Sequence, residues 1–136
     1  MKKSIFLFLL LVSTISKGVE VSDNLLNAIC DAESHGNVNA VGDNGKAIGA
    51  FQIHKIYVDD VNNFSSVKYT YEDRKNKEKS KAIVKAYLEH YGKNYEKKTG
   101  KKATNEVLAR IHNGGPNGWK KDATKKYWNK VEKELK

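Results

Sequence analysis

Apolar residues recur at intervals of three and four in five parts of the chain, a spacing that puts them on one face of a helix. The clearest set is Leu25, Leu26 and Ile29, which follows a Ser22 or Asp23 that can cap the first free amides of a helix. Gly100 stands where the third pattern ends, as expected of a residue that stops a helix. The predicted helices cover about residues 22–32, 50–61, 72–100, 105–112 and 128–135.

Two segments rich in Gly and Asn interrupt this helical pattern. Residues 36–49 hold few large apolar side chains and contain the turn-forming Asp43-Asn44-Gly45, while residues 113–118 surround the sole proline, Pro116. The pattern predicts a mainly α fold of the α+β type with about five helices. A short, irregular β-hairpin or loop after the first helix is expected to form one wall of a cleft.

The first residues have the order of a secretory signal. Met1-Lys2-Lys3-Ser4 is basic, residues 5–12 are apolar, and small and polar residues follow. The apolar run is well below the ~20 residues that a membrane-spanning helix needs, so we expect export without stable membrane insertion. We predict a signal peptide over residues 1–18, cleaved near Ser16 or Gly18, and a single domain over residues 19–136.

The net charge indicates which partners the protein can bind, and the cysteine content indicates whether disulfides can stabilise it. The chain has a formal net charge of +9, and loss of Lys2 and Lys3 with the signal peptide would leave +7. Such an excess favours anionic partners, and export argues against nucleic acid among them. Cys30 is the only cysteine, so no intramolecular disulfide can form and we expect it to be buried in the core.

Two carboxylates, one just before the first loop and one within it, lie in settings that differ. Glu33 falls in the last turn of the first predicted helix, where the negative end of the helix dipole disfavours the ionised form. Asp43 lies ten residues later in a polar turn. Cleavage of a glycosidic bond needs one protonated and one ionised carboxyl group, and this pair could supply them. The residues alone leave a second interpretation open, in which Glu33 is a surface side chain and Asp43 a turn former.

Longer strings of residues favour the catalytic interpretation of Glu33 and Asp43. The run Ala109-Arg110-Ile111-His112-Asn113-Gly114-Gly115-Pro116-Asn117-Gly118 leads from a helix into a His-Asn-Gly-Gly-Pro turn, and Tyr127-Trp128-Asn129 follows it. Upstream stand Glu33-Ser34, then Gly49-Ala50-Phe51-Gln52-Ile53, then Tyr57 and Asp60. In order and spacing these strings resemble the invertebrate-type (destabilase-like) lysozymes over about residues 25–133.

The resemblance implies a lysozyme-like fold and a secreted glycoside hydrolase. Its substrate would be the β-1,4 bond between N-acetylmuramic acid and N-acetylglucosamine in the glycan strands of peptidoglycan, at an anionic bacterial surface. It assigns Glu33 as general acid and Asp43 as the second carboxylate, nucleophile or stabiliser. It also implies sugar contacts, for which the expected residues are Phe51, Gln52, Ile53, Tyr57, Tyr91, His112, Asn113 and Gly114. Core packing is an equally good explanation for Tyr57 and Tyr91.

The chain departs from the family in its cysteines. Animal members are cysteine-rich, whereas here Cys30 stands alone and Trp119 occupies a place where a cysteine is common. This points to a divergent member stabilised by packing.

Other functions remain open. The loop 34–40 also resembles lytic transglycosylases and goose-type lysozymes, which work with one glutamate, so Glu33 could act alone. A non-catalytic cationic protein that binds cell walls is a further possibility, and for the isopeptide cleavage of some relatives we find no convincing residues. We expect no metal and no cofactor, because the four histidines show no ligand spacing. We also expect a monomer, with His54 and His90 at the surface.

Overall fold

The computed structural model describes residues 18–136. Five α-helices, four short 3₁₀ helices and one hairpin make up this part of the chain, which confirms the predicted mainly α fold with a hairpin after the first helix. In chain order the elements are α1 (Asp23–Ser34), β1 (Val41–Gly42), η1 (Asp43–Gly45), β2 (Ala47–Ile48), α2 (Lys55–Phe64), η2 (Tyr71–Lys75), α3 (Lys77–Thr99), α4 (Asn105–Gly114), η3 (Gly118–Lys120), η4 (Asp122–Thr124) and α5 (Lys125–Glu132).

The predicted signal peptide, residues 1–18, lies outside the described residues apart from Gly18 and stays a prediction. Within residues 18–136, the structure contains no helix with both the length and the apolar character needed to cross a bilayer.

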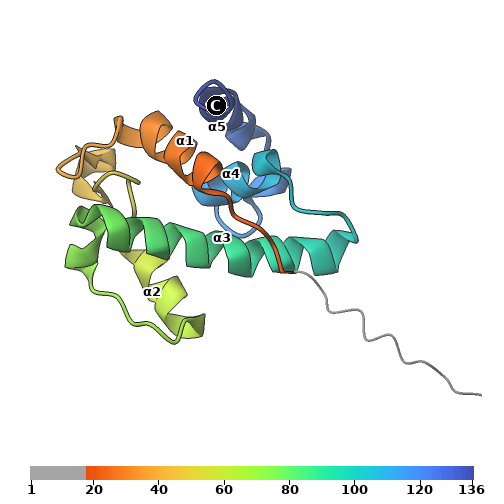
Figure 1. Cartoon of the computed structure of the whole chain (residues 1–136), viewed down its shortest axis with the longest axis horizontal. Helices are drawn as coiled ribbons and strands as arrows, with labels where there is room; N and C mark the ends of the chain where they lie inside the picture. The colour runs from red at the N-terminus through yellow and green to blue at the C-terminus, as the bar shows by residue number, and fades with distance from the viewer. Residues whose placement is uncertain (1–17) are drawn as a thin grey trace, which may run out of the picture.

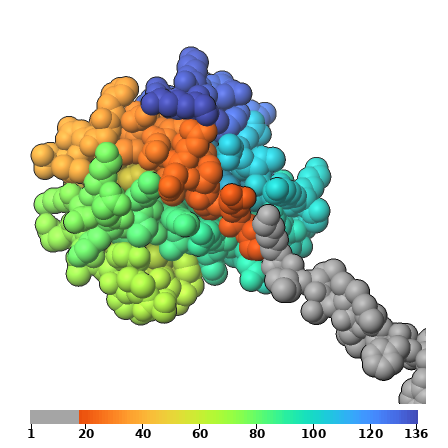
Figure 2. All heavy atoms as spheres, in the orientation of Figure 1, coloured from red at the N-terminus to blue at the C-terminus, as the bar shows by residue number. Residues whose placement is uncertain are grey.

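The long helix α3 runs through the middle of the molecule (Figure 1). It contacts α2 on one side and α1 and α4 on the other, and α5 packs against α4 and α1. Ile83 and Leu88 of α3 are fully buried in the core. The last residue closes the fold onto α1, because the Asn24 side chain bonds to both the N–H and the carbonyl oxygen of Lys136, at 3.2 and 2.9 Å. The N-terminal and C-terminal helices accordingly lie side by side on the face in Figure 2.

Helix α1 forms for the local reasons that the sequence contains. The Ser22 hydroxyl accepts from the N–H of Leu25 at 3.1 Å, and the helix ends at His35 in the left-handed conformation. Its apolar side is buried, and Cys30 is 4% exposed within it. Burial raises the pKa of the Cys30 thiol, so the group stays neutral and packs as a small hydrophobe.

The hairpin is held by one side chain, Gln52, from the segment that follows it. β1 and β2 are antiparallel, with Val41 opposite Ile48. The Gln52 amide nitrogen donates to the carbonyl oxygens of Ala40 and Gly49 at 3.2 and 2.9 Å. This side chain therefore fastens both ends of the hairpin to one point.

Three predicted helix boundaries were wrong. The second helix begins at Lys55 and not near Ala50, because residues 50–53 form a turn whose Ile53 pairs with Ile48 in an isolated bridge. The third helix begins at Lys77: the Asn76 side chain caps it by accepting from Lys79 N at 2.9 Å, and residues 71–75 form the separate η2. The last helix covers Lys125–Glu132 and ends before Leu135. Gly100 does end the third helix, with φ at 70°.

Gly49 allows the chain to pass closely beneath η2. Its φ is +84°, and a Cβ there would lie 1.9 Å from the backbone oxygen of Arg74. We expect Gly49→Ala to lower the free energy of unfolding by about 3 kcal/mol or more, because a backbone clash adds to left-handed strain. Gly45→Ala is the matched control, since φ is +87° there but no atom lies within 4 Å, and strain alone costs about 1–2 kcal/mol. Urea denaturation of both variants measures the difference; equal losses would contradict the close contact.

Candidate active site

A pocket of about 780 Å³ opens between the hairpin, α2 and the end of α4. Four carboxylates and no Lys or Arg line it, in contrast to the positive net charge of the whole chain. The lining residues are Glu33, Asp43, Ala47, Gln52, His54, Ile56, Tyr57, Asp59, Asp60, Asn63, Tyr87, His112, Asn113, Gly115 and Pro116.

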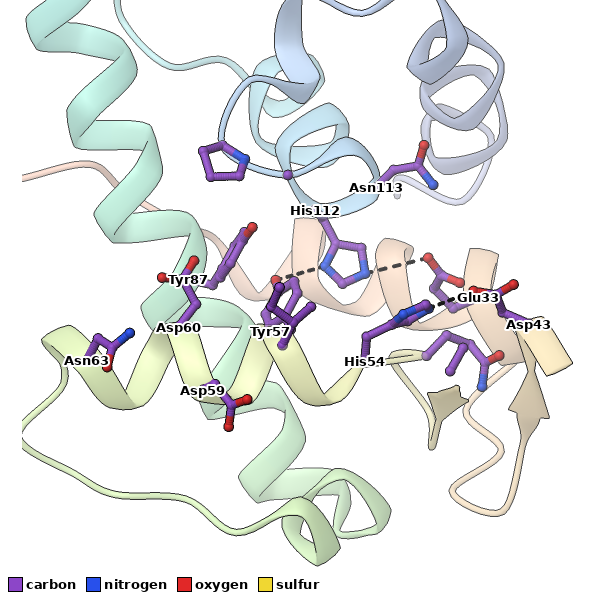
Figure 3. Close-up of a pocket in the computed structure, with 15 residues that line it drawn as sticks. Glu33, Asp43, His54, Tyr57, Asp59, Asp60, Asn63, Tyr87, His112 and Asn113 are labelled. Carbon is purple, nitrogen blue, oxygen red and sulfur yellow. Dashed lines mark hydrogen bonds and ion pairs between the residues drawn. The ribbon is translucent and has the colours of Figure 1, made fainter. Parts of the chain in front are cut away.

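Glu33 reaches the pocket from the last turn of α1 and is held within a short polar chain. Its side chain is 18% exposed, and its Oε1 lies 3.5 Å from Nε2 of His112. The Nδ1 atom on the other side of that ring lies 2.9 Å from the Tyr57 hydroxyl (Figure 3). Burial raises the pKa of Tyr57 well above 10, so Tyr57 keeps its proton and can donate it to Nδ1. With Nδ1 facing Tyr57, Nε2 is the ring nitrogen that faces Glu33.

Aromatic rings enclose this glutamate. Tyr57 stacks on Tyr87 with ring centroids 3.7 Å apart, and the ring of His112 meets Tyr57 edge-on at 5.5 Å. Burial, and then the nearby Glu33 carboxylate, raise the pKa of Tyr127 well above 10. The Tyr127 hydroxyl is buried and has no well-aligned hydrogen-bond partner within residues 18–136. Glu33 thus lies among aromatic rings with limited access to water.

Asp43 is in contrasting surroundings. It begins η1, between the two strands, and its side chain is 59% exposed. Its Oδ2 lies 3.1 Å from Nε2 of His54, as Figure 3 shows. Glu33 and Asp43 therefore line one pocket, one of them enclosed and the other open to solvent. This is the difference in environment that two carboxylates of unlike protonation require.

His54 is 40% exposed, in keeping with its expected place at the surface, but it also lines the pocket and pairs with Asp43. His90 is half-buried and stacks on Phe64, with centroids 3.8 Å apart, outside the pocket.

The side chains expected to contact sugar separate into two groups. Gln52, Tyr57, His112 and Asn113 line the pocket. The other four lie elsewhere, and they are Phe51, Ile53, Tyr91 and Gly114.

Packing explains why each of these four residues lies outside the pocket. Phe51 and Ile53 are 1% exposed and belong to the core, because the turn before α2 directs both side chains inward, so they present no surface to a ligand. The Tyr91 hydroxyl lies outside the pocket lining and donates a hydrogen bond to the Asp60 carboxylate. Gly114 packs against η4, where a Cβ would lie 2.6 Å from Thr124. Gly115 and Pro116 line the wall in its place.

Sequence reasoning missed most of a stripe on α2. Ile56, Asp59, Asp60 and Asn63 line the far end of the pocket at positions i, i+3, i+4 and i+7. Helical spacing could have identified this stripe, because the helix predicted over residues 50–61 already contained Ile56, Asp59 and Asp60. The Asp59 carboxylate accepts from the Tyr71 hydroxyl at 2.7 Å. The acidic residues do not combine into a metal centre: in residues 18–136, no three His, Cys, Asp or Glu side chains are grouped to hold an ion.

Comparison with known proteins gives one consistent result. The family model described as Destabilase matches residues 22–134. A lysozyme from Ostrea edulis is 33% identical over 137 residues, which cover 98% of this chain and 96% of the oyster protein. The crystal structure of Tapes japonica lysozyme matches with a TM-score of 0.68 and 30% identity, covering 82% of this chain and 89% of that one. The inhibitor-bound lysozyme from Meretrix lusoria matches with a TM-score of 0.67 and 34% identity, covering 85% and 92%. The fold is therefore lysozyme-like, as the sequence predicted.

Proposed function

Because the chain belongs to the destabilase family of invertebrate-type lysozymes, we propose that it is a glycoside hydrolase that cleaves peptidoglycan between N-acetylmuramic acid and N-acetylglucosamine. The observation that carries this proposal is the pair Glu33 and Asp43 in one pocket, the first 18% and the second 59% exposed. The lysozyme names of the relatives from Ostrea edulis, Tapes japonica and Meretrix lusoria support the same reaction class.

The proposed reaction proceeds in two steps. The Glu33 carboxyl donates its proton to the glycosidic oxygen, and the bond from that oxygen to C1 breaks as the leaving sugar departs. The ionised Asp43 carboxylate attacks C1 from the opposite face and forms a covalent glycosyl ester. Glu33, now a carboxylate, takes a proton from water, whose oxygen attacks C1 and releases Asp43. Two inversions at C1 give net retention of configuration.

The remaining pocket residues are assigned to orientation. His112, held by Tyr57, fixes the Glu33 side chain at its Oε1. Asn113 and the Gly115-Pro116 turn line the pocket and suit contacts to sugar hydroxyl and N-acetyl groups. Tyr57 and Tyr87 supply the apolar part of the wall, against which sugar rings can pack.

The second candidate is a lytic transglycosylase that uses Glu33 alone. The high exposure of Asp43 and its place in a tight turn favour this alternative, because a turn former needs no catalytic role. Digestion of purified peptidoglycan, read by mass spectrometry, separates the candidates. Reducing ends support hydrolysis, and 1,6-anhydro ends mean transglycosylation. Intact glycan would leave a cationic wall-binding protein and overturn both enzymatic proposals.

We also propose that the protein is exported and that its positive charge speeds encounter with anionic walls. Residues 120–136 alone contain seven lysines and three acidic residues. Turnover of peptidoglycan should fall about tenfold between low salt and about 0.5 M salt, because salt screens surface charges. The control substrate is a neutral oligomer of N-acetylglucosamine, whose cleavage should hardly change. Equal salt profiles for the two substrates would contradict a role for the charge.

A further inference from the structure

We propose that His54 is a positioning residue that holds the Asp43 carboxylate in the pocket. The inference rests on the function proposed above, and it assigns a role to a side chain that the sequence had placed at the surface. Its starting point is the 3.1 Å contact between Nε2 of His54 and Oδ2 of Asp43 (Figure 3).

Asp43 has little else to fix it. Its φ is 48°, and Asn44 and Gly45 follow with φ of 54° and 87°, so three left-handed residues in succession form the turn that carries the carboxylate. The side chain is 59% exposed. Within residues 18–136, the His54 imidazole is the one polar side chain that contacts this carboxylate. Without that contact the carboxylate would be free to turn toward solvent.

His54, in contrast, stands on a rigid base. The preceding Ile53 is 1% exposed, and its carbonyl oxygen accepts from Nη1 of the buried Arg74 at 3.2 Å. The helix that follows is anchored by Tyr57 and Val58, both buried. A ring held at this junction can fix a flexible partner, because its own backbone cannot follow the turn.

The local chemistry of α2 supports the same assignment. His54 is the N-cap residue of the helix, yet its side chain makes no capping hydrogen bond. Ser, Thr, Asp or Asn at this position would stabilise the helix start, whereas His54 does not. The imidazole instead faces the hairpin. Nε2 of an imidazole can carry a proton, so it can donate toward the Oδ2 atom of Asp43.

Position matters because nucleophilic attack tolerates little displacement. A misplacement of about 1 Å can cost about 10²-fold in rate. We expect His54→Ala to lower kcat on a neutral glycan oligomer about tenfold and to leave KM within about twofold. His54→Gln should recover most of the loss, because the glutamine amide nitrogen reaches the place of Nε2. If the ring only filled space, His54→Gln would not recover the lost activity.

A double-mutant cycle with Asp43→Asn tests whether His54 acts through Asp43. In the Asp43→Asn background, His54→Ala should change kcat by less than about twofold. An equal tenfold loss in both backgrounds, or a rise in KM with kcat unchanged, would overturn the proposal and indicate a direct contact with substrate.

Crystal structures of the wild type and of His54→Ala separate this inference from the proposed function. The Asp43 carboxylate should occupy one conformer facing the pocket in the wild type, and several conformers or a solvent-facing one in the variant. An unchanged single conformer would overturn the positioning role, whether or not the protein cleaves glycan. Failure of the wild type to cleave any glycan would overturn the proposed function while this structural comparison still decides the role of His54.

Discussion

Glu33→Gln is expected to lower peptidoglycan turnover about 10³-fold or more while leaving the fold intact. Glutamine keeps the size of the side chain but has no acidic proton to give to the leaving oxygen, and general acid catalysis contributes about 10²–10⁴-fold. Within residues 18–136, Glu33 is the one carboxylate that pairs with His112. Initial rates of release of soluble fragments, together with circular dichroism, measure the two effects.

Asp31→Asn is the matched control for this variant. Asp31 lies on the same helix two residues earlier and does not line the pocket. The control should keep wild-type turnover. Substantial activity in Glu33→Gln, or an equal loss in Asp31→Asn, would rule out Glu33 as the proton donor.

Asp43→Asn is expected to lower turnover about 10²-fold or more. The amide cannot form the ester with C1 and carries no charge to stabilise the oxocarbenium-like centre, and removal of one such electrostatic partner costs about 10²–10³-fold. The variant should fold normally, because Asp43 is exposed and asparagine also tolerates a left-handed φ. The same rate assay on neutral oligomers and peptidoglycan measures the loss.

Glu72→Gln controls for the removal of a carboxylate at the surface. Glu72 is exposed, pairs with Lys75 at 3.3 Å and lies outside the pocket. Its rate should match the wild type. Full activity in Asp43→Asn would instead support a mechanism in which Glu33 acts alone.

Local signals in the sequence predicted much of the fold. The start of α1 at Ser22 and the end of α3 at Gly100 follow from capping chemistry within a few residues. The hairpin followed from Asp43-Asn44-Gly45, whose side chains tolerate the left-handed turn between the strands. Glu33 and Asp43 line the same pocket, since the hairpin that carries Asp43 directly follows the helix that carries Glu33.

The remaining features depend on contacts between distant residues. Phe51 and Ile53 pack into the core from a turn, so their apolar character was mistaken for the first part of a helix and for a sugar-binding surface. The pairing of His54 with Asp43 joins a helix start to a hairpin turn, and no periodicity within either segment encodes it. The stripe on α2 was within reach of helical spacing, since the predicted helix contained all of it except Asn63, but nothing in the segment itself showed that this face lines a pocket.

The configuration of the first product tests the roles of Glu33 and Asp43 most directly. Proton NMR of a fresh digest of an N-acetylglucosamine oligomer or a peptidoglycan fragment resolves the two anomers before they equilibrate. A double displacement through Asp43 predicts that the β anomer forms first. An initial excess of the α anomer would contradict Asp43 as the nucleophile.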